Sequence, residues 1–179
     1  MILRAAVAAD AAAIAAIYAS YIADTVSFET EAPDVAAMAG RIAAGAPFHP
    51  WIVAAEAGTV LGYAYAGAFS PRDAYRWMPE TTIYLARESV GQGLGRRLYG
   101  ALLATLAAQG FTQAIGRIAL PNDPSLALHR ALGFREVGLL RRAGWKAGRW
   151  IDVAIWQRAL SAVDGAPGEP RPFTAIVAP

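Results

Sequence analysis

Three alternating glycines stand directly before a predicted helix and mark a candidate binding site. The segment SVGQGLGRRLYGALLATLAAQGF (residues 89–111) places Gly91, Gly93 and Gly95 ahead of leucines that recur with a helical period. Glycine is costly there unless the backbone takes unusual angles or a ligand comes very close. Because the free N–H groups and positive dipole end of a helix N-terminus attract anions, the segment predicts an anion site.

Two well-known phosphate loops do not fit this spacing. A dinucleotide fingerprint would need a third glycine where Leu98 stands, and Ile115 lies in the region where the ribose-binding acid is expected. A nucleoside-triphosphate loop needs a lysine, and none follows these glycines. What remains is VGQGLG (residues 90–95) followed by Arg96 and Arg97, a loop whose successive N–H groups can hold a pyrophosphate.

This loop resembles the pyrophosphate loop of the GNAT acyl-CoA N-acyltransferase superfamily, whose pattern is Gln/Arg-x-x-Gly-x-Gly/Ala. Val90 departs from the pattern, because Gln or Arg is usual there. Downstream, Asn122 opens a short predicted helix and His129 stands where the superfamily has a tyrosine. From Ile2 to about Thr174 the chain resembles the phosphinothricin and methionine sulfone/sulfoximine acetyltransferases, through TVSFETE, GYAYAG, RDAYRW, PETTIYL, LPNDPS, LHRALGF, GRWIDV and PRPFT in that order.

The resemblance implies transfer of acetyl from acetyl-CoA, a co-substrate used without a metal, to the amino group of a small acidic amino acid such as phosphinothricin or methionine sulfoximine. An ammonium group must lose a proton before it attacks, and the resemblance assigns Glu80 as the general base. It places His129 near the thioester sulfur, to protonate the departing thiolate or to relay a proton. Which of the two is the dominant base stays open.

The resemblance also implies two sets of binding residues. For acetyl-CoA they are Ile83, Tyr84, Leu85, Val90, Gly91, Gln92, Gly93, Leu94, Gly95, Arg96, Asn122 and Ser125. For the amino acid they are Phe28 as a pocket wall, with Arg72, Tyr75 and Arg76. A guanidinium can hold a carboxylate or phosphinate through two hydrogen bonds. Each arginine alone also fits a solvated loop, but their position shortly before Glu80 favours a substrate site.

Helices and strands that position these residues alternate along the chain. Helices are predicted from an N-cap at Asp10 onward, with Tyr21 on the apolar face, and at residues 34–44, 94–109 and 122–132. Strands are predicted at residues 51–56, 59–67, 81–86, 112–120, 134–142 and 148–158. The order predicts an α/β (α+β) protein with a mixed sheet and helices on both faces, which the resemblance makes the mostly antiparallel GNAT fold. Residues 1–164 would form this domain and residues 165–179 a proline-rich tail.

Composition narrows the class of protein. The 179 residues fit one domain, and 56% hydrophobic with 17% charged residues argues against disorder. The chain has no cysteine, which excludes disulfides and a cysteine nucleophile and fits the cytoplasm. No apolar run is long enough to span a membrane and no signal-peptide pattern opens the chain, so no membrane partner is expected.

The sequence also contains features of other functional classes. RRAGWKAGRW (residues 141–150) mixes basic and aromatic residues that can grip single-stranded nucleic acid. The net charge is only +2 and the flanks predict a β-hairpin, so a pocket rim or homodimer interface is preferred and no nucleic acid is expected. A non-catalytic acyl-CoA sensor is disfavoured because Glu80 and His129 are both present. Within enzymes, the alternative is a GNAT protein that acetylates another small amine or a protein N-terminus.

Overall fold

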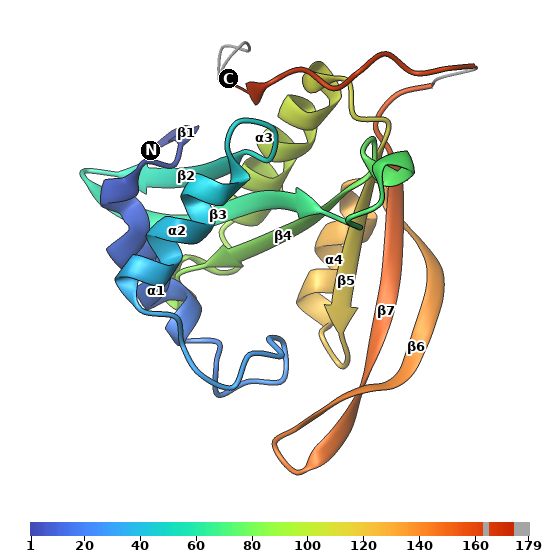
Figure 1. The fold of residues 1–179 in the computed structure, drawn as a ribbon. Helices are drawn as coiled ribbons and strands as arrows, with labels where there is room; N and C mark the ends of the chain where they lie inside the picture. Colours follow the sequence, from blue (N-terminus) through green and yellow to red (C-terminus); the bar gives the residue numbers. More distant parts are fainter. Residues whose placement is uncertain (163–164, 174–179) are drawn as a thin grey trace.

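A seven-stranded sheet organises the part of the chain that the computed structural model describes, residues 1–162 and 165–173 (Figure 1). Its strands lie in the order β1-β2-β3-β4-β5-β7-β6, and every neighbouring pair is antiparallel except β4 and β5. The bounds are β1 (Ile2–Ala5), β2 (Trp51–Glu56), β3 (Thr59–Ala68), β4 (Pro79–Leu85), β5 (Gln113–Ala119), β6 (Arg135–Lys146) and β7 (Arg149–Ala159). The predicted mixed, mostly antiparallel sheet is confirmed.

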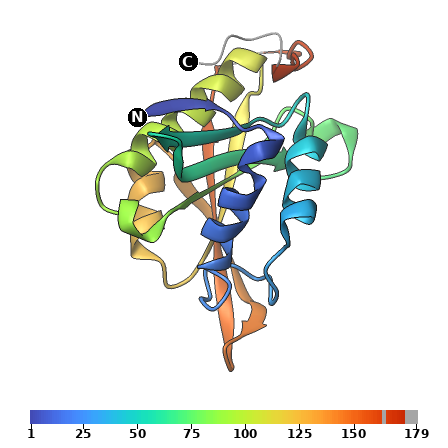
Figure 2. The same cartoon turned by 90° about the vertical axis from the view of Figure 1, so that its left-hand side faces the viewer.

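Helices cover both faces of this sheet, as predicted. They are α1 (Ala11–Ala19), α2 (Val35–Gly45), α3 (Leu94–Gln109) and α4 (Asp123–Ala131). The two views show α1 and α2 on one face and α3 and α4 on the other (Figures 1 and 2). Side chains of β2 point alternately to the two faces of the sheet, so the core has two parts. Val53 packs with α1 and α2, whereas Ile52 and Ala54 pack with α3. None of the helices described here combines the length and apolar character needed to cross a bilayer.

Local signals set the ends of the helices that frame the site. The Asp34 side chain accepts the N–H of Ala37 and begins α2, as its predicted N-cap role requires. Gly110, with φ 97°, ends α3 in the left-handed conformation that glycine adopts without strain. The β6–β7 hairpin turns at Ala147 and Gly148, so β6 extends through Lys146 and takes in most of the segment predicted as its loop.

The N-terminal region differs from the prediction. Residues 2–5 form the short edge strand β1, which the sequence pattern did not predict. Asp10 precedes α1, but its carboxylate caps no helix N–H; it accepts hydrogen bonds from the Arg4 guanidinium at 2.6 and 2.8 Å and from the Val7 N–H at 2.8 Å. Asp10 therefore ties β1 to α1, and Tyr21 lies beyond the end of α1.

The described part of the tail, residues 165–173, runs beside the C-terminal end of α3 (Figure 1). The Arg171 N–H donates to the Gln109 carbonyl at 2.7 Å, and the Gln109 side-chain amide donates to the carbonyls of Phe48 and Arg171 at 3.0 Å. The Trp77 indole N–H donates to the Gly168 carbonyl at 2.8 Å. Residues 163–164 and 174–179 lie outside the described residues, and the predicted division at residue 164 stays a prediction.

Candidate active site

The site begins where β4 and β5 part. These two parallel strands pair at one register position, Glu80 opposite Ile115, and then diverge (Figure 1). On its other edge β4 stays paired with β3 along its whole length. A cavity of about 600 Å³ opens between the diverging strands. Main-chain groups on the β5 side of β4 therefore face the cavity and are available to a ligand.

The predicted anion loop lies along this cleft. Gly91 and Gly93 have φ of 84° and 78°, and a Cβ built on either meets no atom within 4 Å. Both positions thus require the left-handed conformation, and open space lies in front of them. The loop leads into Leu94, the first residue of α3, whose first-turn N–H groups point away from the helix. Together with Arg96, these groups form a positively polarised lining of the cleft that can receive an anion such as a pyrophosphate.

Most of the predicted acetyl-CoA residues come together in the cleft lining: Ile83, Tyr84, Leu85, Val90, Gly91, Gly93, Gly95, Arg96, Asn122 and Ser125. Two predicted residues do not line it. The Gln92 side chain donates to the Glu88 carbonyl at 2.8 Å, and Leu94 is buried in the core. Asn122 also caps α4 by accepting the Ser125 N–H at 3.2 Å. Contact between these side chains and the cofactor stays a prediction.

Glu80 lies within β4, whereas the sequence placed it just before the strand. Its carboxylate forms a two-point ion pair with Arg117 of β5, with Nε to Oε1 and Nη2 to Oε2 both at 2.7 Å. The Glu80 side chain is 20% exposed and that of Arg117 is 55% exposed. The candidate base is therefore held at the junction of the two strands, with both oxygens engaged by one guanidinium.

His129 lines the cleft from α4, but both of its ring nitrogens are engaged below the cleft surface. Nδ1 lies 2.8 Å from the Ser125 carbonyl oxygen, and Nε2 lies 3.1 Å from the Tyr99 hydroxyl. Burial lowers the pKa of His129, while the hydrogen bond to the Ser125 carbonyl acts in the opposite direction. Gly116 permits this position, because a Cβ there would lie 2.6 Å from Nε2.

A chain of hydrogen bonds runs from His129 to the strand that carries Glu80. The Tyr99 hydroxyl lies 2.7 Å from Thr81 Oγ1, and Thr81 donates to the Ile115 carbonyl at 3.0 Å. Carbonyls end the chain on both sides and can only accept, so its four contacts need four protons. A neutral imidazole, a tyrosine and a threonine supply three, and an imidazolium supplies the fourth. The hydrogen-bond chain therefore acts against burial, which is the larger of the two effects and leaves the pKa of His129 below its ordinary value.

A proton relay between Glu80 and His129, one of the roles left open for His129, would have to run through intermediate groups. Among the described residues no hydrogen bond joins Glu80 and His129; Thr81, next to Glu80 in the chain, reaches His129 through Tyr99. Burial raises the pKa of Tyr99, so its hydroxyl keeps its proton at neutral pH.

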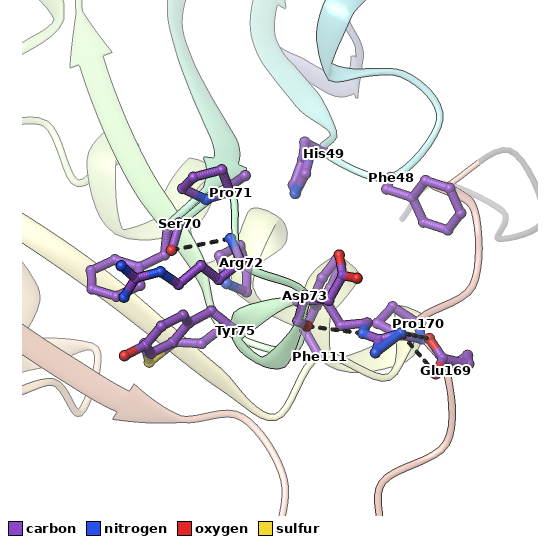
Figure 3. Close-up of a pocket in the computed structure, with 15 residues that line it drawn as sticks. Phe48, His49, Ser70, Pro71, Arg72, Asp73, Tyr75, Phe111, Glu169 and Pro170 are labelled. Carbon is purple, nitrogen blue, oxygen red and sulfur yellow. Dashed lines mark hydrogen bonds and ion pairs between the residues drawn. The ribbon is translucent and has the colours of Figure 1, made fainter.

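The residues predicted to bind the amino-acid substrate lie outside the cleft. Arg72, Tyr75 and Arg76 line a second cavity of about 380 Å³, walled also by Phe48, His49, Phe111 and the tail residues Glu169 and Pro170 (Figure 3). Arg76 is engaged by Glu169 at 3.2 Å and lies over the Trp77 ring. Among the described residues, Arg72 makes no ion pair within 4.0 Å.

The linings of the two cavities meet β4 at different residues. Pro79 lines the second cavity and Thr81 lines the cleft, whereas Glu80, which lies between them in sequence, lines neither cavity because successive side chains of a strand point to opposite faces. Phe28 lines neither cavity and packs on β6, since a Cβ at Gly144 would lie 2.5 Å from its ring. The substrate roles of Phe28, Arg72, Tyr75 and Arg76 remain predictions.

Sequence reasoning missed three residues of the site: Arg117, Tyr99 and Thr81. A signal existed for Arg117, because it is the one charged residue in the apolar strand AIGRIA (residues 114–119). Tyr99 occupies a buried helix position and Thr81 a buried strand position, so each alone has the pattern of a core residue. Their connection depends on how α3 crosses the sheet, which local sequence does not encode.

Comparison with known proteins agrees with this geometry. A family model described as Acetyltransferase (GNAT) domain matches residues 3–155. The phosphinothricin N-acetyltransferase of Streptomyces viridochromogenes is 43% identical over 175 residues, covering 97% of this chain and 93% of the relative. The L-methionine sulfoximine/L-methionine sulfone acetyltransferase of Pseudomonas paraeruginosa is 36% identical over 162 residues, covering 89% and 94%. A crystal structure of a GNAT superfamily phosphinothricin acetyltransferase from Sinorhizobium meliloti in complex with AcCoA superposes with a TM-score of 0.88 at 41% identity, covering 94% of this chain and 93% of that one.

The chain belongs to the GNAT acetyltransferase family. It is an N-acetyltransferase that uses acetyl-CoA as co-substrate, which confirms the predicted fold, enzyme class and cofactor. The relatives do not favour the alternatives of a non-catalytic sensor or of another amine or protein N-terminus as acceptor.

Gly93→Val tests the glycine loop. A valine at φ 78° strains the backbone and puts its side chain into the open space before the loop, so we expect acetyl-CoA affinity to fall at least about tenfold by calorimetry. Gly58→Val is the matched control, because Gly58 has φ 84°, open space around its Cβ and a position in the β2–β3 turn. Equal affinities in the two variants would contradict a cofactor role for the loop.

Tyr99→Phe tests the polarity of the hydrogen-bond chain. If Nε2–H of an imidazolium donates to Tyr99, removing the hydroxyl lowers the pKa of His129 further below its ordinary value, measured by NMR titration. A rise would show that Tyr99 donates to a neutral imidazole and would refute the proposed chain. His49, the other histidine of the chain, is the internal reference whose titration should not change.

Proposed function

We propose that this enzyme acetylates the α-amino group of a small acidic amino acid of the phosphinothricin or methionine sulfoximine/sulfone type. The observation that carries the proposal is the contact of Glu80 with Arg117, a residue that lines the proposed acetyl-CoA cleft, on the strand whose first residue, Pro79, lines a second cavity that presents Arg72. Two relatives named for these substrates align over 93% and 94% of their own lengths, which supports the same substrate class here.

The residues of this chain divide the proton transfers between them. Bound acetyl-CoA supplies an acetyl group activated as a thioester. Glu80 takes a proton from the substrate ammonium, directly or through a water, and the freed amine nitrogen attacks the acetyl carbon. As the carbon–sulfur bond breaks and the thiolate leaves, the same nitrogen loses a second proton to water and the amide forms. Main-chain N–H groups of β4 that face the cleft stabilise charge on the carbonyl oxygen. His129, supported by Tyr99 and Thr81, returns a proton to the thiolate.

The second cavity would receive the side chain of the amino acid. Arg72 can form a two-point contact with a phosphinate, and Tyr75 lies beside it on the same wall (Figure 3). Arg76 is held by Glu169 and would shape the wall without binding substrate directly. Phe28, 43% exposed beside β6, would cover the substrate from the hairpin side.

We further propose that the enzyme works as a homodimer in the cytoplasm. Exposed apolar side chains on the β6–β7 hairpin support a self-association surface: Val137, Leu139, Leu140, Trp145 and Trp150. A chain without cysteine suits a reducing compartment. Acetylation of phosphinothricin by such an enzyme would give resistance to that herbicide.

A thiol-release screen tests the substrate class. The enzyme with acetyl-CoA is offered phosphinothricin, methionine sulfoximine, methionine sulfone, the common amino acids and simple amines. Release of CoA thiol should be fastest with the first three. Preference for a simple amine or a peptide N-terminus would overturn the proposal.

Glu80→Gln tests the chemistry with the substrate found by that screen. Glutamine keeps the shape and still accepts a hydrogen bond from Arg117, but it cannot take a proton, so we expect kcat to fall about 10²–10⁴-fold at pH 7. The loss should shrink as pH rises, because more of the amine then arrives unprotonated. The exposed Glu136→Gln is the control. Near-parental kcat in Glu80→Gln would remove Glu80 as the base.

A further inference from the structure

The ion pair between Glu80 and Arg117 is complementary in charge and spacing to the ammonium and carboxylate groups of an α-amino acid. Two contacts of 2.7 Å join the carboxylate and the guanidinium. In an α-amino acid, the ammonium and carboxylate are attached to the same carbon and lie at a similar separation. A zwitterion laid against the pair would place its ammonium on Glu80 and its carboxylate on Arg117.

The pair is open enough for this exchange. Arg117 is 55% exposed and lines the cleft, and its guanidinium has no second acidic partner among the described residues. An ion pair this accessible to water contributes little net free energy, so a substrate that offers an equal set of contacts can replace it. The planar guanidinium meets a carboxylate through two parallel hydrogen bonds, which also orients the head group.

The other arginines near the cleft are placed for different partners. Arg87 is engaged by Asp24 and lies over the Tyr21 ring. Arg96 follows the glycine loop at the first turn of α3, where the cofactor's phosphates are expected. Arg117 is the arginine of the described chain in hydrogen-bond contact with the candidate base.

We propose that Arg117 is the residue that recognises the α-carboxylate of the substrate, and that this contact releases Glu80 to act as the base. The inference rests on the proposed function and adds the head-group requirement: the enzyme acts on free α-amino acids and discriminates against amines that lack the neighbouring carboxylate. In the unliganded enzyme the guanidinium occupies both oxygens of Glu80. When the substrate carboxylate takes the guanidinium, one Glu80 oxygen becomes free to accept the ammonium proton.

Paired substrates separate this role from a structural one. Methionine sulfone and its α-carboxamide share an amino group and side chain, and only the first has the carboxylate. In the parent, kcat/KM should favour the acid by about ten- to a hundredfold. In Arg117→Leu, kcat/KM for the acid should fall by about that factor, while the value for the amide should hold or rise because Glu80 is no longer engaged. Arg117→Lys keeps a charge without the two-point geometry and should retain part of the preference.

The outcomes separate the two proposals. An equal fall with both substrates in Arg117→Leu would overturn the inference and leave Arg117 as a support for Glu80. Arg135→Leu, on the exposed start of β6, is the matched control and should leave the acid-to-amide ratio unchanged. If the parent acetylates none of the acids, the proposed function fails on its own. Calorimetry of methionine sulfone binding in the presence of CoA then still tests the head-group contact, and equal affinity for parent and Arg117→Leu would refute it.

Discussion

The divergence of two parallel strands after one paired position is the constraint on which the site depends. β4 can leave β5 without loss elsewhere because β3 holds its other edge and β7 holds the other edge of β5. The opening then exposes main-chain groups that a continuous sheet would satisfy. Glu80 sits at the vertex, and the glycine loop follows the free end of the same strand. The distance between the candidate base and the glycine loop is therefore set by the length of β4.

The two groups proposed for proton transfer, Glu80 and His129, are both already engaged in hydrogen bonds within the protein. Arg117 engages the oxygens of Glu80, and the Ser125 carbonyl and Tyr99 hydroxyl engage the nitrogens of His129. For His129, burial and the hydrogen-bond chain act in opposite directions on its proton affinity. If Glu80 and His129 transfer protons as proposed, their hydrogen bonds must change partners, so positioning and acid–base chemistry would be coupled in this site.

Features written in consecutive residues were predictable from sequence, and features that depend on distant contacts were not. The glycine loop, the N-cap at Asp34 and the stop at Gly110 follow local rules and appear in the structure where the sequence indicates. Asp10 has the local pattern of a cap, yet a guanidinium from β1 takes its carboxylate. Similarly, closeness in sequence suggested that Arg72 lies in a substrate site beside Glu80, but which cavity each side chain lines depends on the three-dimensional course of β4, and Arg72 lines a cavity separate from the cleft.

Glu169 and Pro170, which form one wall of the second cavity, are synthesised after the residues that line the cleft. The residues that line the cleft end at His129, whereas the second cavity needs residues close to the end of the described chain. During synthesis on the ribosome, the lining of the cofactor cleft is complete in sequence while the second cavity still lacks one wall. The second cavity therefore gains this wall only after every residue of the cleft lining has been made.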